Sequence, residues 1–203
     1  MSTITDRASR LADHVDDDRL DLSAIEIARF AYPRLDPSSV LDRLEALAAE
    51  VRGDTHLALR RVIAIRHGIG GNVDDYQNPD NSFINRVIET RRGIPISLSV
   101  VWMEVGRRAG IEMQGVALPG HFVAYAGGQM VDPFHYGEAI GSDEAAALIA
   151  QAIGGDPRLD KRWLEPVSTR DIVRRMLRNL EGRYFDDPQS LEWVSACLSA
   201  LMD

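Results

Sequence analysis

One histidine and one aspartate in this chain are spaced so that they could act together as an acid–base pair. His121 precedes a Gly127-Gly128 pair, and Asp132 follows it. Two glycines between apolar segments predict a two-residue hairpin loop, which places His121 and Asp132 on one face, roughly 7–8 Å apart at the backbone. A carboxylate there can orient an imidazole and stabilise its protonated form, as a triad base requires. The competing interpretation is structural, with Asp132 capping a turn and His121 satisfying a backbone group.

A metal site built from two histidines of this hairpin is not expected. Side chains alternate between the two faces of a strand, so His135 falls on the face opposite to His121. The remaining histidines show no ligand-like spacing; they are His14, His56 and His67. The single cysteine rules out a multi-cysteine metal site. We therefore predict no metal and no other cofactor.

A triad also needs a nucleophile, and the candidates lie on a predicted buried helix that starts at Pro95. Ser97 is about 200° around that helix from Pro95, and Ser99 lies on the Pro95 face about 5.4 Å further along. Either serine could attack a substrate only if the helix start or the histidine strand were shifted. The competing interpretation is a serine bonded to a carbonyl one turn earlier. Cys197 lies on the apolar stripe of the last predicted helix and is interpreted as a small buried hydrophobe.

The order of the predicted elements indicates an α+β fold. Apolar periodicity and capping residues predict helices at 23–32, 36–51, 55–66, 82–90 after a turn at 77–81, 95–109, 142–153, 169–183 and 188–202. Alternating or compact apolar segments predict strands at 111–117, 121–126 and 129–134. We expect a buried central helix on a small antiparallel sheet, flanked by N- and C-terminal helices. The expected regions are an N-terminal helical region over 1–70, a core over 71–165 and closing helices over 166–203.

Composition narrows the classes of function. The 203 residues are 45% apolar and 27% charged, which is typical of a globular protein. The 31 acidic and 23 basic residues give a net charge of −8, which disfavours a nucleic-acid partner. No apolar stretch approaches the roughly 20 residues that span a membrane, and no targeting segment is visible. One cysteine suits a reducing compartment, so a cytoplasmic location is predicted.

Two charged segments are interpreted as solvated faces. The first is the acidic run Asp16-Asp17-Asp18. The second is a basic face on the 169–183 helix, where arginines recur every four residues, with a docking site as the alternative. Its members are Arg170, Arg174 and Arg178.

Four motifs taken together resemble the bacterial SirB-type branch of the transglutaminase-like superfamily, the invasion-regulator-like proteins. They read YQNPDNSF at 76–83, RRGIPISLS at 91–99, PGHF at 119–122 and VDPF at 131–134. The resemblance is strong over 57–134 and implies a papain-like α+β core with a Cys-His-Asp triad. His121 and Asp132 match the triad histidine and aspartate. The family's cysteine position is occupied by Pro95, a residue suited to a first helical turn but unable to act as a nucleophile.

The resemblance therefore implies a transglutaminase-like protein without its nucleophilic cysteine. The leading hypothesis is a non-catalytic or regulatory module that binds a protein or peptide, with no nucleic-acid or membrane partner. Its expected groove is lined by Asn81, Pro95, Phe122 and Phe134. One alternative is a hydrolase or acyltransferase that uses Ser99, Ser97 or an activated water with the His121/Asp132 pair. Another is a pure scaffold whose own side chains fill the groove. Relatives in this branch continue into a tetratricopeptide-like region, of which the segment after Met176 would be a reduced form.

Overall fold

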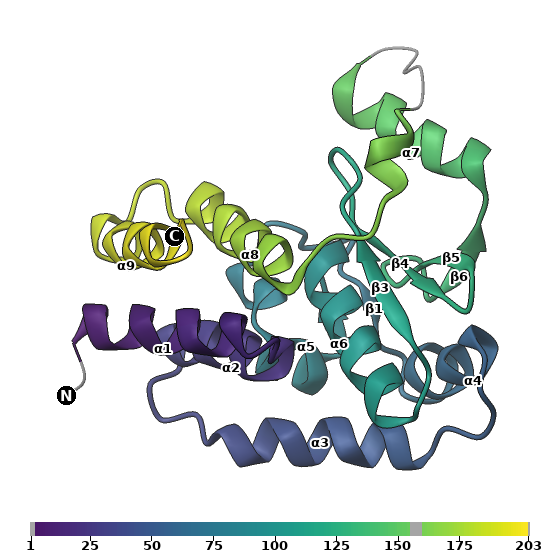
Figure 1. The fold of residues 1–203 in the computed structure, drawn as a ribbon, viewed down its shortest axis with the longest axis horizontal. Coiled ribbons are helices and arrows are strands. Elements are labelled where there is room, and N and C mark those ends of the chain that lie inside the picture. Colours follow the sequence, from purple (N-terminus) through teal and green to yellow (C-terminus); the bar gives the residue numbers. More distant parts are fainter. Residues whose placement is uncertain (1–2, 155–159, 203) are drawn as a thin grey trace.

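The predicted buried helix stands at the centre of the molecule (Figure 1). A computed structural model describes residues 3–154 and 160–202. In it, helix α6 (Pro95–Arg108) begins with proline in its first turn, where the missing N–H has no helical partner to lose. Its middle residues Val100, Val101 and Trp102 are fully buried. Helices on one side and a sheet on the other contact α6, which explains why it is apolar on almost every side.

The N-terminal region is helical, as predicted. It comprises α1 (Ile4–Asp16), α2 (Leu20–Ala31), α3 (Pro37–Ala49) and α4 (His56–Arg60), which continues as a π-helix over Arg61–Arg66. Asp36 caps α3 by accepting the Ser38 N–H at 3.1 Å, which confirms the Asp-Pro start signal. Helix α1 was not among the predicted ranges, although Thr3 and Asp6 form a capping box at its start.

Four short strands form an antiparallel sheet in chain order. They are β3 (Met113–Val116), β4 (Val123–Ala126), β5 (Gln129–Asp132) and β6 (Glu138–Ile140). Ala126 pairs with Gln129 and Ala124 with Val131, so the predicted Gly-Gly hairpin register is confirmed. Strand β6 was not predicted, because three residues are too few to show alternation. A separate parallel pair joins β1 (Gly70–Gly71) to β2 (Arg92–Gly93).

The segment between β1 and α6 supports the head of the central helix. Pro79–Ser82 forms a 3-10 turn, and α5 (Ile84–Thr90) follows it. Helix α5 ends at Arg91, which has φ +64° in the left-handed region. The predicted turn followed by a helix to Thr90 is therefore confirmed, and the two elements place Asn81 beneath the start of α6.

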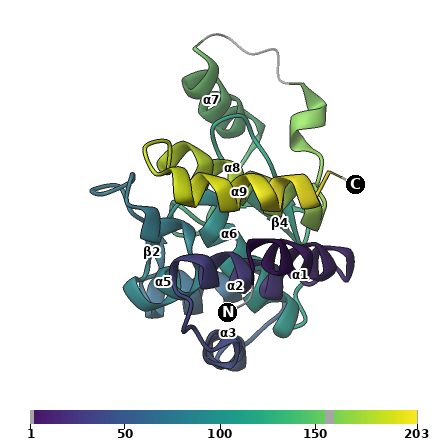
Figure 2. The ribbon, with the colours of Figure 1, turned by 90° about the vertical axis from the view of Figure 1, so that its left-hand side faces the viewer.

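The remaining helices follow the sheet. They are α7 (Ser142–Ile153), a 3-10 turn at Lys161–Leu164, α8 (Thr169–Arg183) and α9 (Pro188–Ala200). The bounds of α7 and α8 match the predicted ranges. Helices α1 and α9 lie side by side in both views (Figures 1 and 2). The acidic run is exposed but also contacts α8: Asp16 pairs with Arg170 at 2.6 Å, and Asp18 accepts the Thr169 hydroxyl at 2.5 Å.

A buried carboxylate joins the N-terminal helices to the end of α6. Asp21 of α2 is 1% exposed and lies 2.7 Å from Arg108, 3.2 Å from Arg107 and 3.0 Å from Arg19. Glu104, one turn earlier on α6, binds both of the α6 arginines. Burial alone would raise the pKa of Asp21, but hydrogen bonds from Arg19 and Arg108 outweigh it and lower that pKa.

These elements confirm an α+β fold in which a buried central helix packs on a small antiparallel sheet. Further helices precede and follow these elements in the sequence. Within residues 3–154 and 160–202, no helix combines the length and apolar character needed to cross a bilayer.

Candidate functional site

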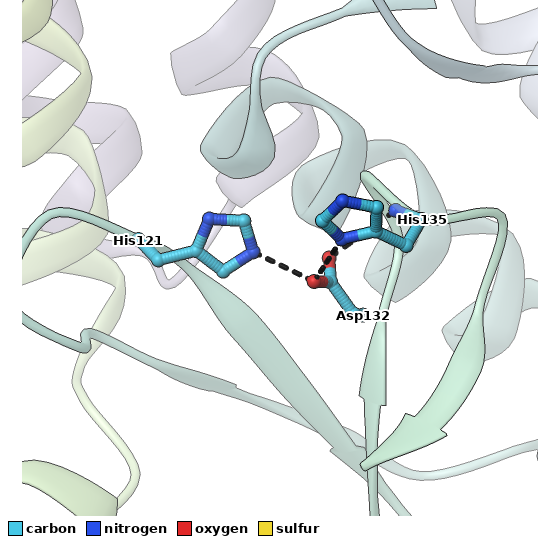
Figure 3. Close-up of side chains that lie close together, drawn as sticks. All are labelled: His121, Asp132 and His135. Carbon is cyan, nitrogen blue, oxygen red and sulfur yellow. Dashed lines mark hydrogen bonds and ion pairs between the residues drawn. The ribbon is translucent and has the colours of Figure 1, made fainter. Parts of the chain in front are cut away.

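His121 lies in the loop between β3 and β4, directly after Gly120. Gly120 has φ +71°, and a Cβ there would lie 2.2 Å from the Cβ of Ala152 in α7, so only glycine fits. The backbone carbonyl of His121 accepts a hydrogen bond from Arg175 of α8 at 2.9 Å. The side chain is 11% exposed and points toward the end of β5 (Figure 3).

Asp132 ends β5 and is 1% exposed, with all of its acceptor capacity directed at neighbouring groups. Its Oδ1 accepts the backbone N–H groups of Phe134 at 2.9 Å and His135 at 3.4 Å. Its Oδ2 lies 2.8 Å from His121 Nε2 and 2.7 Å from His135 Nδ1. Burial alone would raise the pKa of Asp132, but the hydrogen bonds and charges of the two imidazoles outweigh it and lower that pKa.

The contact with Asp132 fixes the tautomer of the His121 ring. An ionised carboxylate only accepts hydrogen bonds, so Nε2 carries the proton that faces Oδ2. The lone pair of the neutral ring is therefore on Nδ1. Among the residues that the structure describes, no group hydrogen-bonds to Nδ1. The pair is thus arranged as a base held by a carboxylate, as the hairpin spacing predicted, and Nδ1 is the atom that can accept a proton.

The prediction that His135 lies opposite to His121 is wrong. Both imidazoles approach the same oxygen of Asp132, with ring centroids 6.1 Å apart (Figure 3). The alternation rule fails because β5 ends at Asp132, and the chain turns at Pro133 before reaching His135. An Asp-Pro dipeptide is itself a turn signal, and it could have limited the strand to 129–132.

The turn that carries His135 is seated on the central helix. Gly137 has φ +69°, and a Cβ there would lie 2.0 Å from the ring of Trp102 in α6. Tyr136, also at positive φ, has its backbone carbonyl bonded to Arg60 at 3.1 Å. Close packing of the bare Gly137 backbone on the Trp102 indole therefore fixes the height of this turn above α6.

At the head of α6 the candidate serines are bonded to backbone carbonyls. The Ser97 hydroxyl lies 2.5 Å from the carbonyl of Asn81 and accepts the Ile94 N–H at 3.2 Å. The Ser99 hydroxyl donates to the Pro95 carbonyl at 2.9 Å. Both side chains are buried. Both hydroxyls therefore satisfy local backbone groups, as the competing interpretation of the two serines expects.

The four residues of the expected groove do not lie together around one cavity. Pro95 and Phe122 line a cavity of about 20 Å³ with His121, enough for about one water molecule. Asn81 instead holds its loop through the backbone carbonyl of Asp75 at 2.7 Å. Phe134 packs edge-on against the His121 ring, with centroids 6.1 Å apart. The groove expected above Pro95 is therefore a small cavity.

Helix α8 covers this cavity with a residue that sequence reasoning missed. Arg175 donates to the backbone carbonyls of Leu118 at 2.8 Å and His121 at 2.9 Å, and its guanidinium lies over the Phe122 ring. Burial lowers the pKa of Arg175 from its usual value. The basic periodicity singled out other arginines of this helix, and nothing in the sequence distinguishes Arg175 from them.

Cys197 is far from these groups in the chain and lies on α9. It is 1% exposed, and burial raises the pKa of its thiol to about 12. The predicted interpretation as a buried apolar residue is confirmed.

A buried helix whose head lies beside a histidine just before β4 and an aspartate at the end of β5 is the arrangement of a papain-like α+β core. The sequence model of the protein family described as "Transglutaminase-like superfamily" matches residues 38–178 of this chain. The chain therefore belongs to that superfamily.

Curated relatives agree with this assignment. A UPF0162 protein of Xylella fastidiosa is 37% identical over 188 aligned residues, which cover 84% of this chain and 67% of that protein. A UPF0162 protein of Pseudomonas aeruginosa is 26% identical, with 78% of this chain and 62% of that protein covered. Human F-box only protein 21 is 29% identical, over 54% of this chain and 18% of that protein. No solved structure gives a significant match.

Proposed function

We propose that this chain is a non-catalytic transglutaminase-like module, of the SirB-type branch, that binds a protein or peptide partner. The observation that carries the proposal is Pro95, which stands at the nucleophile position and shares a cavity with His121. The hydroxyls of Ser97 and Ser99 are both engaged by backbone groups. The module keeps its base and orienting acid but has no thiol beside them.

A pocket next to the small cavity indicates the chemistry of the partner. It has a volume of about 540 Å³ and is lined by Arg174, Arg175 and Arg178, with Asp171 as its acidic residue. Asp171 is already occupied in capping α8. Arg175 and Asn179 line both cavities, so the two are adjacent. Arg175 is engaged by the backbone carbonyls of Leu118 and His121, so the guanidinium groups of Arg174 and Arg178 are the ones that favour a carboxylate-rich segment of a protein. The net charge of −8 and the single cysteine support a cytoplasmic role without nucleic-acid or membrane partners.

Purified protein is expected to show no amidase, protease or transamidase turnover above that of its His121→Ala variant. Without a nucleophile, the His121/Asp132 pair has nothing to activate. The measurement is the release of ammonia from glutamine peptides and of dye from quenched peptides. Robust turnover that His121→Ala abolishes would contradict the proposal.

One observation favours an alternative, a hydrolase that activates water. His121 Nδ1 is free to accept a proton, and the adjoining cavity has room for about one water molecule. A hydrolase or acyltransferase that uses Ser97 or Ser99 would first have to release those hydroxyls from their carbonyl partners. Labelling by a fluorophosphonate distinguishes the serine mechanism, since an activated water gives turnover without labelling.

Pro95→Cys is expected to create a reactive thiol. The start of α6 and the His121 imidazole would favour the thiolate, lowering the thiol pKa from about 8.5 to below about 7.5. The measurement is the pH dependence of alkylation by iodoacetamide. Cys197 gives little background, because burial raises its pKa to about 12.

The double variant Pro95→Cys/His121→Ala is the control for this thiol. It should restore an ordinary thiol pKa, because the imidazole partner is gone. A Pro95→Cys thiol that titrates normally and ignores the His121 change would show that the site is not arranged as a triad remnant.

A further inference from the structure

We propose that His121, Asp132 and His135 form a binding site for a divalent transition-metal ion of the zinc type. Their donor atoms are His121 Nε2, Asp132 Oδ2 and His135 Nδ1, and all three lie within 4.8 Å of one another. The close-up shows the two rings converging on one carboxylate oxygen from separate segments of the chain (Figure 3). This site goes beyond the proposed binding function and does not depend on it.

The donor set matches the chemistry of such ions. Two imidazole nitrogens and one carboxylate oxygen are ligands that Zn²⁺, Co²⁺ and Ni²⁺ accept, with zinc at about 2.0–2.2 Å from each. The two nitrogens now lie 2.8 Å and 2.7 Å from Asp132 Oδ2. An ion seated among the three atoms would replace these two hydrogen bonds. Each neutral ring would move its proton to its other nitrogen and present a lone pair to the ion.

Surrounding groups already hold the three side chains in place. The backbone N–H groups of Phe134 and His135 donate hydrogen bonds to Asp132 Oδ1, which leaves Oδ2 available to bind the metal ion. The Phe134 ring packs edge-on against both imidazoles, with centroids 6.1 Å and 5.2 Å away. Such outer contacts orient ligands before the metal arrives. Asp132 is buried, whereas His135 is 53% exposed, so an ion can enter from the His135 side.

His135 is the residue that separates a metal site from a simple acid–base pair. A base held by a carboxylate needs one histidine and one aspartate, and His121 with Asp132 already supplies both. The second imidazole on the same oxygen has no role in that pair. It completes a three-ligand set that leaves coordination positions open to water or to a side chain of a bound partner.

The test uses the untagged chain of 203 residues, treated with EDTA and dialysed. Zn²⁺ is titrated by calorimetry, and Co²⁺ is followed by its visible absorption. We expect about one ion per chain. His135→Ala should weaken binding by more than about tenfold, because removing even a hydrogen-bond partner of a metal ligand costs about that much, and His135 is proposed as a ligand itself. Because His135 is exposed, this variant should remain folded, which circular dichroism verifies. Zn²⁺ should also raise the melting temperature of the wild type and not that of His135→Ala.

The matched control is His67→Ala. His67 Nε2 lies 3.0 Å from Glu50, so this variant loses a comparable histidine–carboxylate contact away from the proposed site. It should bind Zn²⁺ like the wild type. Absence of binding, or equal affinity of the wild type and His135→Ala, would overturn the proposal. Neither result bears on the turnover assay, so this inference and the proposed function can fail separately.

Discussion

Asp132→Ala is expected to lower the free energy of unfolding by about 3 kcal/mol. The change removes a buried acceptor from two backbone N–H groups and two imidazoles. Leaving buried donors unpaired costs about 1–3 kcal/mol for each group, and breaking a buried charged network costs about 3–5 kcal/mol. Water can reach the exposed His135, so the estimate lies at the low end of that range. Urea unfolding in EDTA at pH 7 measures the effect.

His135→Ala provides the control for this prediction. The side chain is 53% exposed, so water can replace its hydrogen bond, and the loss should stay below about 1 kcal/mol. If Asp132→Ala were as mild as His135→Ala, the carboxylate would not be the structural centre of the turn. Its buried hydrogen bonds would then contribute little to folding.

Asp21→Ala is expected to be at least as damaging, with a loss of about 3–5 kcal/mol. Asp21 is 1% exposed, and Arg108, the closest of its three arginine partners, is only 9% exposed. Arg108 keeps Glu104 as a buried acidic partner, so the loss should lie toward the lower end of the about 3–5 kcal/mol that breaking a buried pair on one side costs. Because the contacts join α2 to α6, the whole N-terminal packing should be weakened. Urea unfolding at pH 7 gives the value.

The effect of Asp21→Ala should also depend on pH. The folded-state pKa of Asp21 is lowered, so its contribution is complete above the unfolded pKa, about 3.9 for aspartate, and is lost as the pH falls through the folded value. The gap in stability between wild type and variant should therefore be constant from pH 7 to 5 and shrink below about pH 4. A gap that grew on acidification would contradict this assignment.

An exposed ion pair gives the control for Asp21. Asp16 lies 2.6 Å from Arg170, a shorter distance than that from Asp21 to any of its three arginines, but the Asp16 side chain is 62% exposed. Surface pairs contribute about 0–1 kcal/mol. Asp16→Ala should therefore change the stability little, which would show that burial, and not distance, sets the size of the effect.

Local patterns were sufficient to predict the elements around the site. Continuous apolar character predicted α6, and the Gly127-Gly128 loop predicted the register that brings His121 to Asp132. Both signals depend on neighbouring residues and on regular geometry. The interpretation of Ser99 as a residue bonded one turn back also agrees with the structure. Each of these features is decided within a single hairpin or a single helix.

The features that could not be predicted depend on where the regular geometry stops and on how elements pack. His135 was misplaced because strand alternation was continued past Pro133. Arg175 was overlooked because periodicity does not reveal which loop a helix covers. Asp21 carries no sequence signal of burial, since its arginine partners at the end of α6 are more than eighty residues away. Such contacts become visible only when α2, α6 and α8 are placed in space.

The contact between Gly137 and Trp102 fixes the turn that follows β5 relative to helix α6. Trp102 belongs to the same helix that begins at Pro95, and the turn resting on its indole carries His135 and follows Asp132 directly. Helix α6 therefore sets the positions of both Pro95 and the Asp132 carboxylate. The residue at position 95 can therefore be exchanged without displacing this turn, because the turn rests on Trp102 and not on Pro95.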